Sequence, residues 1–391
     1  SPGVSLAKPA KPESGKTSQT ATSAMTKPEP EHRLRFCEEC GKAYPVVMAS
    51  TARERICPDC QKQENRVKKQ RVGSQVKRER DKAQINTTSA DLIQREIAAR
   101  EIARRRLMAF AIRLMPSYQA GWVHKEIAAK LEQFLQDAID KKSPRLIIQM
   151  PPRSGKSQLT SVFFPAWAMG RYPWLEVIAA SYSASLAVNF SRQVRHVLRE
   201  TRYKSMFPET RLDEESQSAD GWRTTKGGMY LPVGVGGPAT GRGAHCLVID
   251  DYLKNSEEAE SATTREAIKD WYRTTAYTRL APGGGAMVIA TRWHSDDLSG
   301  WLEADSESGE GDQFEVIRYP ALATEDERYR KKGESLHPER YGREDMLRIK
   351  RAVGPRAWSA LYQQNPLNDE ASYFSHDMFR LYSPPAPRKL G

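Results

Sequence analysis

The most restrictive feature of the sequence is a short apolar run that leads directly into a Gly-Lys-Ser turn. Residues 145–150 (RLIIQM) have the composition of a buried strand, and residues 151–157 (PPRSGKS) separate them from an apolar stretch of helical character. A strand, a turn of this kind and a helix form the phosphate-binding loop of nucleotide hydrolases, in which backbone N–H groups surround the phosphates. The lysine of such a loop reaches the β- and γ-phosphates, and the serine hydroxyl binds Mg²⁺. We therefore expect Lys156 and Ser157 to hold ATP and Mg²⁺.

The loop departs from the common pattern GxxxxGK[ST], because Met150 stands in place of the first glycine and two prolines follow it. A Gly-Lys-Ser triplet alone occurs often by chance, so the interpretation depends on the strand before it, the helix after it and an acidic strand further along the chain. Arg153 and Lys156 are the catalytic candidates of this loop. The residues that we expect at the nucleotide are Pro152, Arg153, Ser154, Gly155, Lys156, Ser157 and Gln158.

Short apolar runs alternate with helical segments from Pro116 onward. The runs are residues 145–150, 174–181, 245–250, 285–291 and 314–320. Apolar residues repeat at helical spacing on two intervening segments: Ile127, Leu131, Phe134 and Ala138, then Leu186, Phe190, Val194 and Val197. Buried strands separated by helices indicate right-handed crossovers and a mostly parallel sheet with helices on both faces. The fold class that we expect is α/β, a P-loop NTPase of the RecA-like (ASCE) type, preceded by a small zinc knuckle and a basic helical segment.

One of these runs ends in two carboxylates, Asp250 and Asp251 (CLVIDD). In P-loop enzymes the first carboxylate of such a strand holds Mg²⁺, and the next often polarises the attacking water. We therefore expect Asp250 to bind the metal and Asp251 to act as the base. Asp has a shorter reach than the more usual Glu, so Glu257 and Glu258 stay open as alternatives for the base. Without the phosphate-binding loop, the same pair would indicate only a solvent-facing acidic turn.

Two further segments carry polar residues that fit the same site. Arg242 stands between glycines (TGRG) before the acidic strand, and an arginine on such a segment can reach a γ-phosphate in its own or in a neighbouring subunit. Thr291 and Arg292 end the next strand, at the sheet edge where the loop lies. We expect Arg242 to be catalytic and the other two to contact the nucleotide. The alternatives are a surface turn and a packed strand end.

Four of the five cysteines form two pairs near the N-terminus, Cys37 with Cys40 and Cys57 with Cys60. Each pair has CxxC spacing and sixteen residues separate the pairs, as in two-knuckle zinc sites. Four thiolates complete a tetrahedron without an open position, which favours a structural Zn²⁺ in a segment too short to have its own core. Two disulfides are the alternative, but they need an oxidising compartment for which the sequence gives no sign.

The positive charge of the chain is concentrated in its first third. Residues 1–115 contain 24 Lys and Arg against 13 Asp and Glu, a net charge of +11, whereas residues 116–391 carry only +1. A basic segment joined to a nearly neutral body suggests contact with nucleic acid, although a solvated tail has the same composition. No run is apolar enough for a membrane span, and the first thirty residues lack the apolar core of a secretory signal.

Together, these motifs resemble a known family. The segments PPRSGKS, TGRGAHCLVIDDYLKNSEEAES, WYRTTAYTRLAPGGGAMVIATRWHSDDLSGWL and YQQNP are similar to the ATPase domain of tailed-bacteriophage large terminase subunits, the motors that package DNA into procapsids. The similarity covers roughly residues 107–382, and TRWHSDDLSGWL is its most specific part. It accounts for the missing first glycine, because Pro152 and Arg153 match the family's own variant of the loop.

The resemblance implies further assignments. The residues that it places at the nucleotide are Asp250 and Asp251 (metal and base), Thr291 and Arg292 (the motif that couples hydrolysis to movement), and Tyr118, Gln119 and His124 (the adenine side). It implies double-stranded DNA as substrate, a portal protein and a small terminase subunit as partners, a ring of five subunits, and the host cytoplasm as location. A large terminase continues into an RNase H-like nuclease domain, which we expect to be missing from this chain.

These observations predict five consecutive segments. They are residues 1–32, a disordered lead-in; 33–64, the four-cysteine zinc knuckle; 65–106, a basic helical linker; 107–365, the ATPase domain; and 366–391, a linker toward the nuclease domain. Two other functions stay open. A helicase-like DNA translocase shares the P-loop and the acidic strand, and a zinc-anchored DNA-binding adaptor would use the nucleotide only as a switch.

Overall fold

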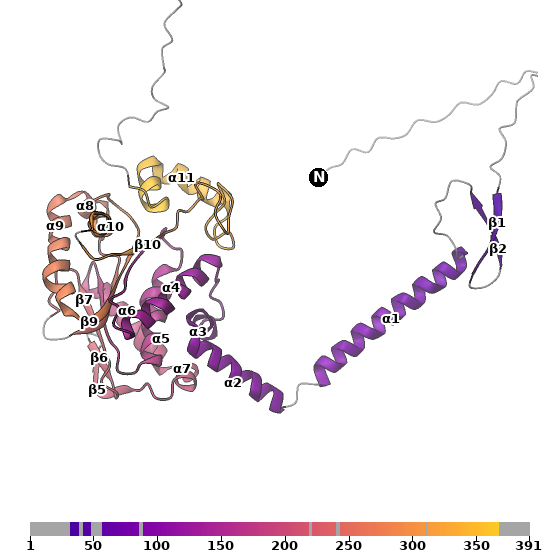
Figure 1. Cartoon of the computed structure of the whole chain (residues 1–391), viewed down its shortest axis with the longest axis horizontal. Coiled ribbons are helices and arrows are strands. Elements are labelled where there is room, and N and C mark those ends of the chain that lie inside the picture. The colour runs from indigo at the N-terminus through magenta and orange to yellow at the C-terminus, as the bar shows by residue number, and fades with distance from the viewer. Residues whose placement is uncertain are drawn as a thin grey trace, which may run out of the picture. The chain divides into compact units, whose positions relative to one another are not determined.

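The computed structural model describes residues 32–38, 42–47, 57–85, 89–218, 221–239, 243–309 and 311–366. The chain divides into two compact units, residues 1–91 and 92–391, which are described separately below (Figure 1). Four predicted features lie outside the described residues: the lead-in up to residue 31, Cys40, Arg242, and the linker from residue 367 onward.

The smaller unit contains a two-stranded sheet and a long helix. Strands β1 (His32–Phe36) and β2 (Ala43–Val47) pair antiparallel, and helix α1 (Pro58–Ile85) begins directly after Cys57. Proline suits the first position of a helix because the N–H that it lacks would have no partner there. Most of the side chains described on α1 are exposed, as its polar sequence predicts.

Helix α2 (Ser89–Arg105) leads into the larger unit and packs on it at its C-terminal end. The indole N–H of Trp167 donates to the carbonyl oxygen of Ala103 at 3.2 Å. Helices α3 (Leu107–Leu114) and α4 (Trp122–Ile139) follow, and the apolar face predicted for α4 is buried. None of the helices in the described part of the chain combines the length and apolarity that a bilayer crossing requires.

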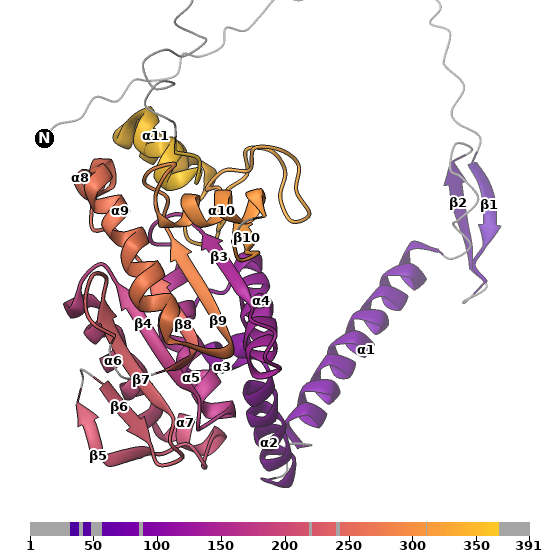
Figure 2. The same cartoon turned by 60° about the vertical axis from the view of Figure 1, so that its left-hand side comes forward.

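Eight strands form one sheet in the described part of the larger unit (Figure 2). They are β3 (Arg145–Gln149), β4 (Glu176–Ser181), β5 (Leu212–Ser218), β6 (Gly221–Thr224), β7 (Met229–Gly234), β8 (Ala244–Asp250), β9 (Leu280–Ala290) and β10 (Glu315–Arg318). The order is β10-β3-β9-β8-β4-β7-β6-β5, parallel from β10 to β7 and antiparallel from β7 to β5. The mostly parallel α/β sheet predicted from the sequence is confirmed, and all five expected runs form strands. The sequence did not indicate β5, β6 or β7.

Further helical segments lie between these strands and after the last of them. They are η1 (Gln158–Phe163), α5 (Phe164–Arg171), α6 (Ala184–Arg199), α7 (Thr201–Met206), α8 (Ser256–Glu260), α9 (Ala262–Trp271), η2 (Tyr272–Ala276), η3 (Tyr277–Arg279), α10 (Leu298–Ser308), α11 (Arg343–Ala357) and η4 (Trp358–Tyr362). Segments η1, η2 and η4 are π-helical, and η3 is a short 3-10 helix.

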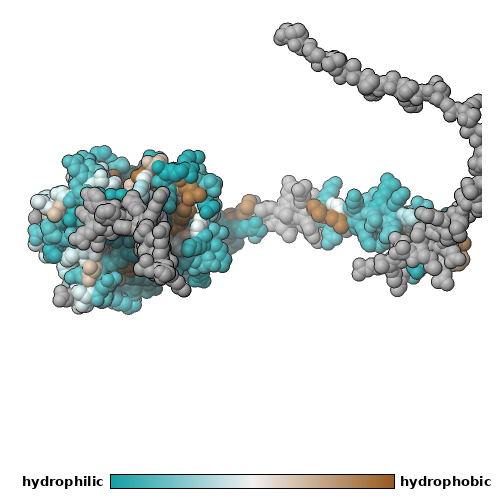
Figure 3. All heavy atoms as spheres, turned by 90° about the horizontal axis from the view of Figure 1, so that it is seen from above, coloured by the Kyte–Doolittle hydropathy of each residue, from teal (hydrophilic) through white to brown (hydrophobic). Residues whose placement is uncertain are grey.

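The core of the larger unit lies on both faces of the sheet. On β8, Val248 belongs to one apolar cluster and Leu247 to the other, because successive side chains of a strand point to opposite faces. Helices α3 to α6 cover the first cluster, and α9 and α10 cover the second. Hydrophilic residues dominate the visible surface of this unit (Figure 3).

The position of β9 between β3 and β8 brings three strand ends together. Gln149 on β3 lies opposite Ala290 on β9, and Asp250 on β8 lies opposite Ile289. Because the three strands are parallel, the residues that follow them leave the sheet at the same edge. The loop that begins at Met150 therefore faces the residues after β8 and β9.

Candidate nucleotide-binding site

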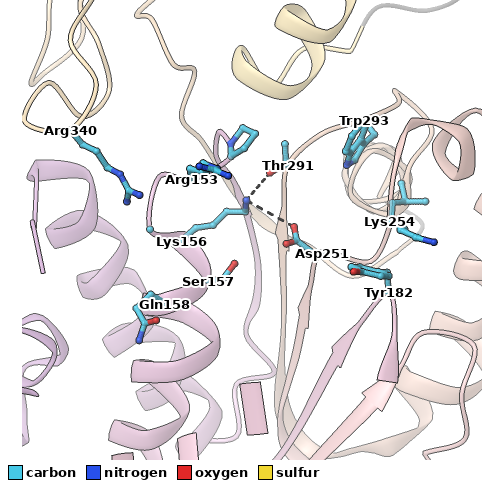
Figure 4. Close-up of a pocket in the computed structure, with 13 residues that line it drawn as sticks. Arg153, Lys156, Ser157, Gln158, Tyr182, Asp251, Lys254, Thr291, Trp293 and Arg340 are labelled. Carbon is cyan, nitrogen blue, oxygen red and sulfur yellow. Dashed lines mark hydrogen bonds and ion pairs between the residues drawn. The ribbon is translucent and has the colours of Figure 1, made fainter. Parts of the chain in front are cut away.

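A cavity of about 420 Å³ opens at this edge of the sheet (Figure 4). Its volume is in the range of small-molecule sites. The residues that line it are Pro152, Arg153, Gly155, Lys156, Ser157, Gln158, Tyr182, Asp251, Leu253, Lys254, Thr291, Trp293 and Arg340. The structure thus brings most of the predicted loop residues to one cavity. Ser154 does not line it and is buried, with its hydroxyl donating to the carbonyl oxygen of Pro151 at 2.5 Å.

Lys156 links the loop to the two neighbouring strand ends. Its ammonium group donates to Thr291 Oγ1 at 2.7 Å and lies 4.0 Å from a carboxylate oxygen of Asp251 (Figure 4). The lysine side chain is only 7% exposed, whereas that of Asp251 is 39% exposed. A buried cation with one partly solvated carboxylate at 4.0 Å retains much of its attraction for an anion. The arrangement therefore suits a phosphate group in the cavity.

Asp250 lies buried below the loop, at the end of β8. One carboxylate oxygen accepts a hydrogen bond from Ser161 Oγ at 2.5 Å, and the other has no hydrogen-bond partner among the described residues. Burial and then the charge of Asp251 raise the pKa of Asp250 to about 7, while the charge of Lys156 and then the Ser161 and Ser157 hydroxyls act to lower it. A buried carboxylate oxygen without a partner, close to a serine hydroxyl, fits a hard cation such as Mg²⁺.

Asp251 is the carboxylate that faces the cavity. Its backbone is left-handed (φ 51°), and its carbonyl oxygen accepts from the Tyr182 N–H at 2.8 Å. The two alternative bases do not line the cavity. Glu257 is exposed on α8, and the Glu258 carboxylate accepts from the Lys254 N–H at 2.9 Å, at the start of that helix. The geometry therefore favours Asp251 over either glutamate.

Two residues of the loop have positive φ angles. Gly155 has φ 86°, which glycine adopts freely, whereas Arg153 has φ 57°, which is costly for a residue with a side chain. Such strain persists where the surrounding structure holds it, and it concentrates at functional sites. The Arg153 guanidinium lies beside the loop in the close-up (Figure 4).

The three residues assigned to the adenine side do not line the cavity. Gln119 is exposed, and Tyr118 is half-buried with its ring 5.5 Å from that of His124. His124 is buried behind the loop, with Nε2 2.7 Å from the Ser154 carbonyl oxygen. Tyr118 and His124 therefore contact the protein side of the loop.

Arg292 also lies outside the cavity, although it follows Thr291 directly. Its guanidinium pairs with Asp297 at 3.1 Å and with Glu303 at 3.4 Å, and it donates to the carbonyl oxygens of His294 and Ser295. Asp297 in turn caps α10, accepting from the N–H of Gly300 at 2.9 Å. The structure places Arg292 in a buried scaffold beside the site.

Five cavity residues carry no prediction from the sequence: Tyr182, Leu253, Lys254, Trp293 and Arg340. Tyr182 follows β4 directly, and Trp293 follows Thr291 by two residues, so their place after strand ends was a usable signal. Arg340 comes from the segment between β10 and α11, where the sequence shows no motif. Figure 4 shows Arg340 on the side of the loop opposite Tyr182, Lys254 and Trp293.

Three of the four predicted zinc ligands are among the described residues of the smaller unit. The Sγ atoms of Cys37, Cys57 and Cys60 all lie within 4.8 Å of one another. Zinc–sulfur bonds of about 2.3 Å place the sulfurs of a tetrahedral site roughly 3.8 Å apart, so this spacing fits a bound ion. The Cys57 N–H donates to Cys37 Sγ at 3.3 Å, directly before the first turn of α1.

Comparison with protein families gives one match. Residues 147–381 match the family described as "Terminase large subunit, T4likevirus-type, N-terminal". No curated protein sequence matches the chain significantly.

Among solved structures, the large terminase of bacteriophage HK97 aligns with 13% identity and a TM-score of 0.41, over 60% of this chain and 50% of that one. A mutant of the large terminase ATPase domain of Thermus phage P74-26 aligns with 14% identity and a TM-score of 0.40, over 66% and 97%. The large terminase of a thermophilic bacteriophage aligns with 12% identity and a TM-score of 0.39, over 63% and 56%. The match thus spans about half the length of the HK97 protein.

Proposed function

The chain belongs to the family of T4-like large terminase subunits, and we propose that it is the ATP-hydrolysing motor part of such a subunit. Hydrolysis would drive the translocation of double-stranded DNA into a procapsid. The observation that carries this proposal is the position of Lys156. It lies on a glycine-containing loop after a parallel strand, 2.7 Å from Thr291 and 4.0 Å from Asp251, at the edge of a cavity large enough for a nucleotide.

In the proposed reaction, Lys156 and the loop amides hold the phosphates. Thr291 orients the lysine, because it accepts from Nζ while its own hydroxyl lies 3.3 Å from the Met150 carbonyl oxygen. Asp251 aligns the attacking water, since it follows β8, two strands away from β3 in the sheet, and faces the cavity. Arg153 stabilises negative charge on the transferred phosphoryl group.

Ser157 and Asp250 would hold the Mg²⁺ that shields the phosphate charge during transfer. Support comes from the buried Asp250 oxygen without a partner among the described residues and from the Ser157 hydroxyl, which lines the cavity and acts on Asp250. Ser161 keeps the Asp250 carboxylate in one orientation through its 2.5 Å hydrogen bond.

We also propose that Arg242, outside the described residues, completes the site from a neighbouring subunit of a five-membered ring. The small terminase, the portal and the host cytoplasm belong to the same proposal. Membership of the family supports these assignments.

Phosphate release tests the central claim. The rate should need Mg²⁺, increase when duplex DNA is added, and rise more than linearly with protein concentration if an arginine acts between subunits. A chain that binds ATP but shows no Mg²⁺-dependent turnover at any concentration would contradict the proposed ATPase. Linear dependence would contradict the inter-subunit arginine alone.

For the smaller unit we propose a structural Zn²⁺ on Cys37, Cys40, Cys57 and Cys60. The clustering of three of these thiols supports it. Elemental analysis should find about one zinc per chain, and Cys57→Ser should lower that content. Full zinc content in the variant would rule out this ligand set. The predicted segment boundaries, with the knuckle at 33–64 and the ATPase domain at 107–365, also belong to the proposal.

A further inference from the structure

We propose that His124 is a positioning residue that fixes the phosphate-binding loop, and that it does not contact the base of the nucleotide. This inference rests on the proposed ATPase function. Three observations carry it: the hydrogen bonds of the two ring nitrogens, the packing around the ring, and the closeness of the ring to Gly155.

The hydrogen bonds of the ring determine its tautomer. The N–H of Gly121 donates to Nδ1 at 3.1 Å, so Nδ1 carries a lone pair. Nε2 lies 2.7 Å from the carbonyl oxygen of Ser154, which can only accept, so Nε2 carries the proton. The neutral ring therefore connects the first turn of α4 to the backbone of the loop.

The packing around the His124 ring holds it in one orientation. His124 is 1% exposed, and its ring makes edge-on contacts with the rings of Tyr118 at 5.5 Å and His337 at 4.8 Å. Burial lowers the pKa of His124, which agrees with the neutral form that both hydrogen bonds require. His337 belongs to the segment after β10, so residues from three parts of the sequence hold the ring.

The ring lies directly against the turn of the loop. A Cβ atom at Gly155 would be 3.2 Å from His124 Nε2 and 3.5 Å from the Tyr118 hydroxyl. The hydrogen bond from His124 to the Ser154 carbonyl oxygen therefore fixes the position of the backbone just before Lys156, where the loop amides would contact the phosphates. His124 itself is not among the residues that line the cavity. It acts on the nucleotide through the loop.

Two substitutions separate the roles of the nitrogens. In His124→Gln, the side-chain amide can accept from Gly121 and donate to Ser154, so it replaces both bonds. In His124→Asn, the shorter amide keeps the Gly121 bond and loses the reach to Ser154. We expect KM for ATP to rise about tenfold in the Asn variant with kcat within about twofold, because the loop binds ground state and transition state alike. The Gln variant should stay within about threefold of the native KM.

Equal KM values in Gln and Asn variants that both fold would overturn the proposal. So would a changed ratio of the KM values for ATP and GTP, because a base contact would alter it. Should the Asn variant fail to fold, the Gln variant decides alone: an increase of about tenfold in its KM contradicts the proposal.

The same variants are titrated with a fluorescent ATP analogue at equilibrium. If the native chain binds the analogue without turnover, the proposed ATPase fails while the affinities still test His124. If the native chain shows no binding, both proposals fail.

Discussion

Thr291 and Arg292 are neighbours in the chain, yet their side chains belong to regions of opposite character. Thr291 contacts Lys156 at the cavity, where Asp251 is partly solvated, and one oxygen of the buried Asp250 below the loop has no partner among the described residues. Arg292 makes contacts with two carboxylates and two carbonyl oxygens in a buried network. Incomplete polar pairing marks the region that is built to bind something, and complete pairing marks the scaffold. The predictions below test this contrast, and the largest effect comes first.

Lys156→Ala should reduce ATP turnover at least about a thousandfold, equivalent to about 4 kcal/mol of activation free energy, because it removes the cation at the phosphate position. The melting temperature should change little, because Lys156 has one hydrogen bond and one ion pair at 4.0 Å to lose. Phosphate release and thermal melting measure the two effects. Lys226→Ala, on an exposed lysine away from the cavity, is the matched control. Turnover near the native rate would disprove the assigned role.

Arg292→Ala should lower the free energy of unfolding by about 3 kcal/mol, because it leaves the fully buried Asp297 carboxylate without the cation that pairs with it. Urea unfolding followed by tryptophan fluorescence measures it, since all eight tryptophans lie in residues 92–391. Arg292→Lys keeps the charge but not the planar fork, so an intermediate loss is expected. Arg348→Ala, on an arginine with a 73% exposed side chain, is the control. A loss below about 1 kcal/mol for Arg292→Ala would remove the contrast between the regions.

Asp250→Asn, unlike Arg292→Ala, should increase the free energy of unfolding at pH 8 in the absence of Mg²⁺. The folded pKa of about 7 lies above the unfolded value of about 3.9, so the folded state binds more protons between these values and stability falls as pH rises. The neutral amide should therefore raise the unfolding free energy by roughly 1–2 kcal/mol at pH 8 and by little at pH 4. The control is Asp297→Asn, which should destabilise at both pH values. A destabilised Asp250→Asn at pH 8 would contradict this prediction.

Thr291→Val should lower turnover by about tenfold, because it removes the hydrogen bond that orients Lys156. Its stability should change less than that of Arg292→Ala, one residue further along. Thr291→Ser retains the hydroxyl and should recover most of the rate. If Ser and Val lose activity equally, the methyl group and not the hydroxyl is what matters.

Zinc chelation should have the smallest effect on the stability of the larger unit. Removing zinc should unfold the cysteine segment, since three of its ligands hold a short unit together. The tryptophan-detected melting of the larger unit should shift by less than about 2 °C, because the two units are separate compact bodies. Circular dichroism and tryptophan fluorescence report on the two parts. If the melting temperature of the larger unit falls as much after chelation as it does in the Arg292→Ala variant, the stability of one unit depends on the other.

Much of the fold could be predicted because the central strands are short, apolar and separated by helices. Strand β5 (LDEESQS) escaped prediction because it is polar, and at an edge of the sheet it needs no buried face. Lys156, Asp251 and Thr291 could be placed because parallel strand ends meet at one edge. The direction of the Arg292 side chain could not, because it depends on how the turn after Thr291 folds Asp297 and Glu303 back onto the guanidinium.

The geometry of the site depends on the number of residues in η1 as well as on the identity of its side chains. A π-helical turn contains one residue more than an α-helical turn. Deleting one of residues 158–160, which lie between the loop and Ser161, would rotate Ser161 by about 100° relative to the loop. The Ser161 hydroxyl would then point away from Asp250, although neither residue had been replaced. An insertion or deletion between the loop and Ser161 should therefore break the hydrogen bond to Asp250 as a substitution of Ser161 would.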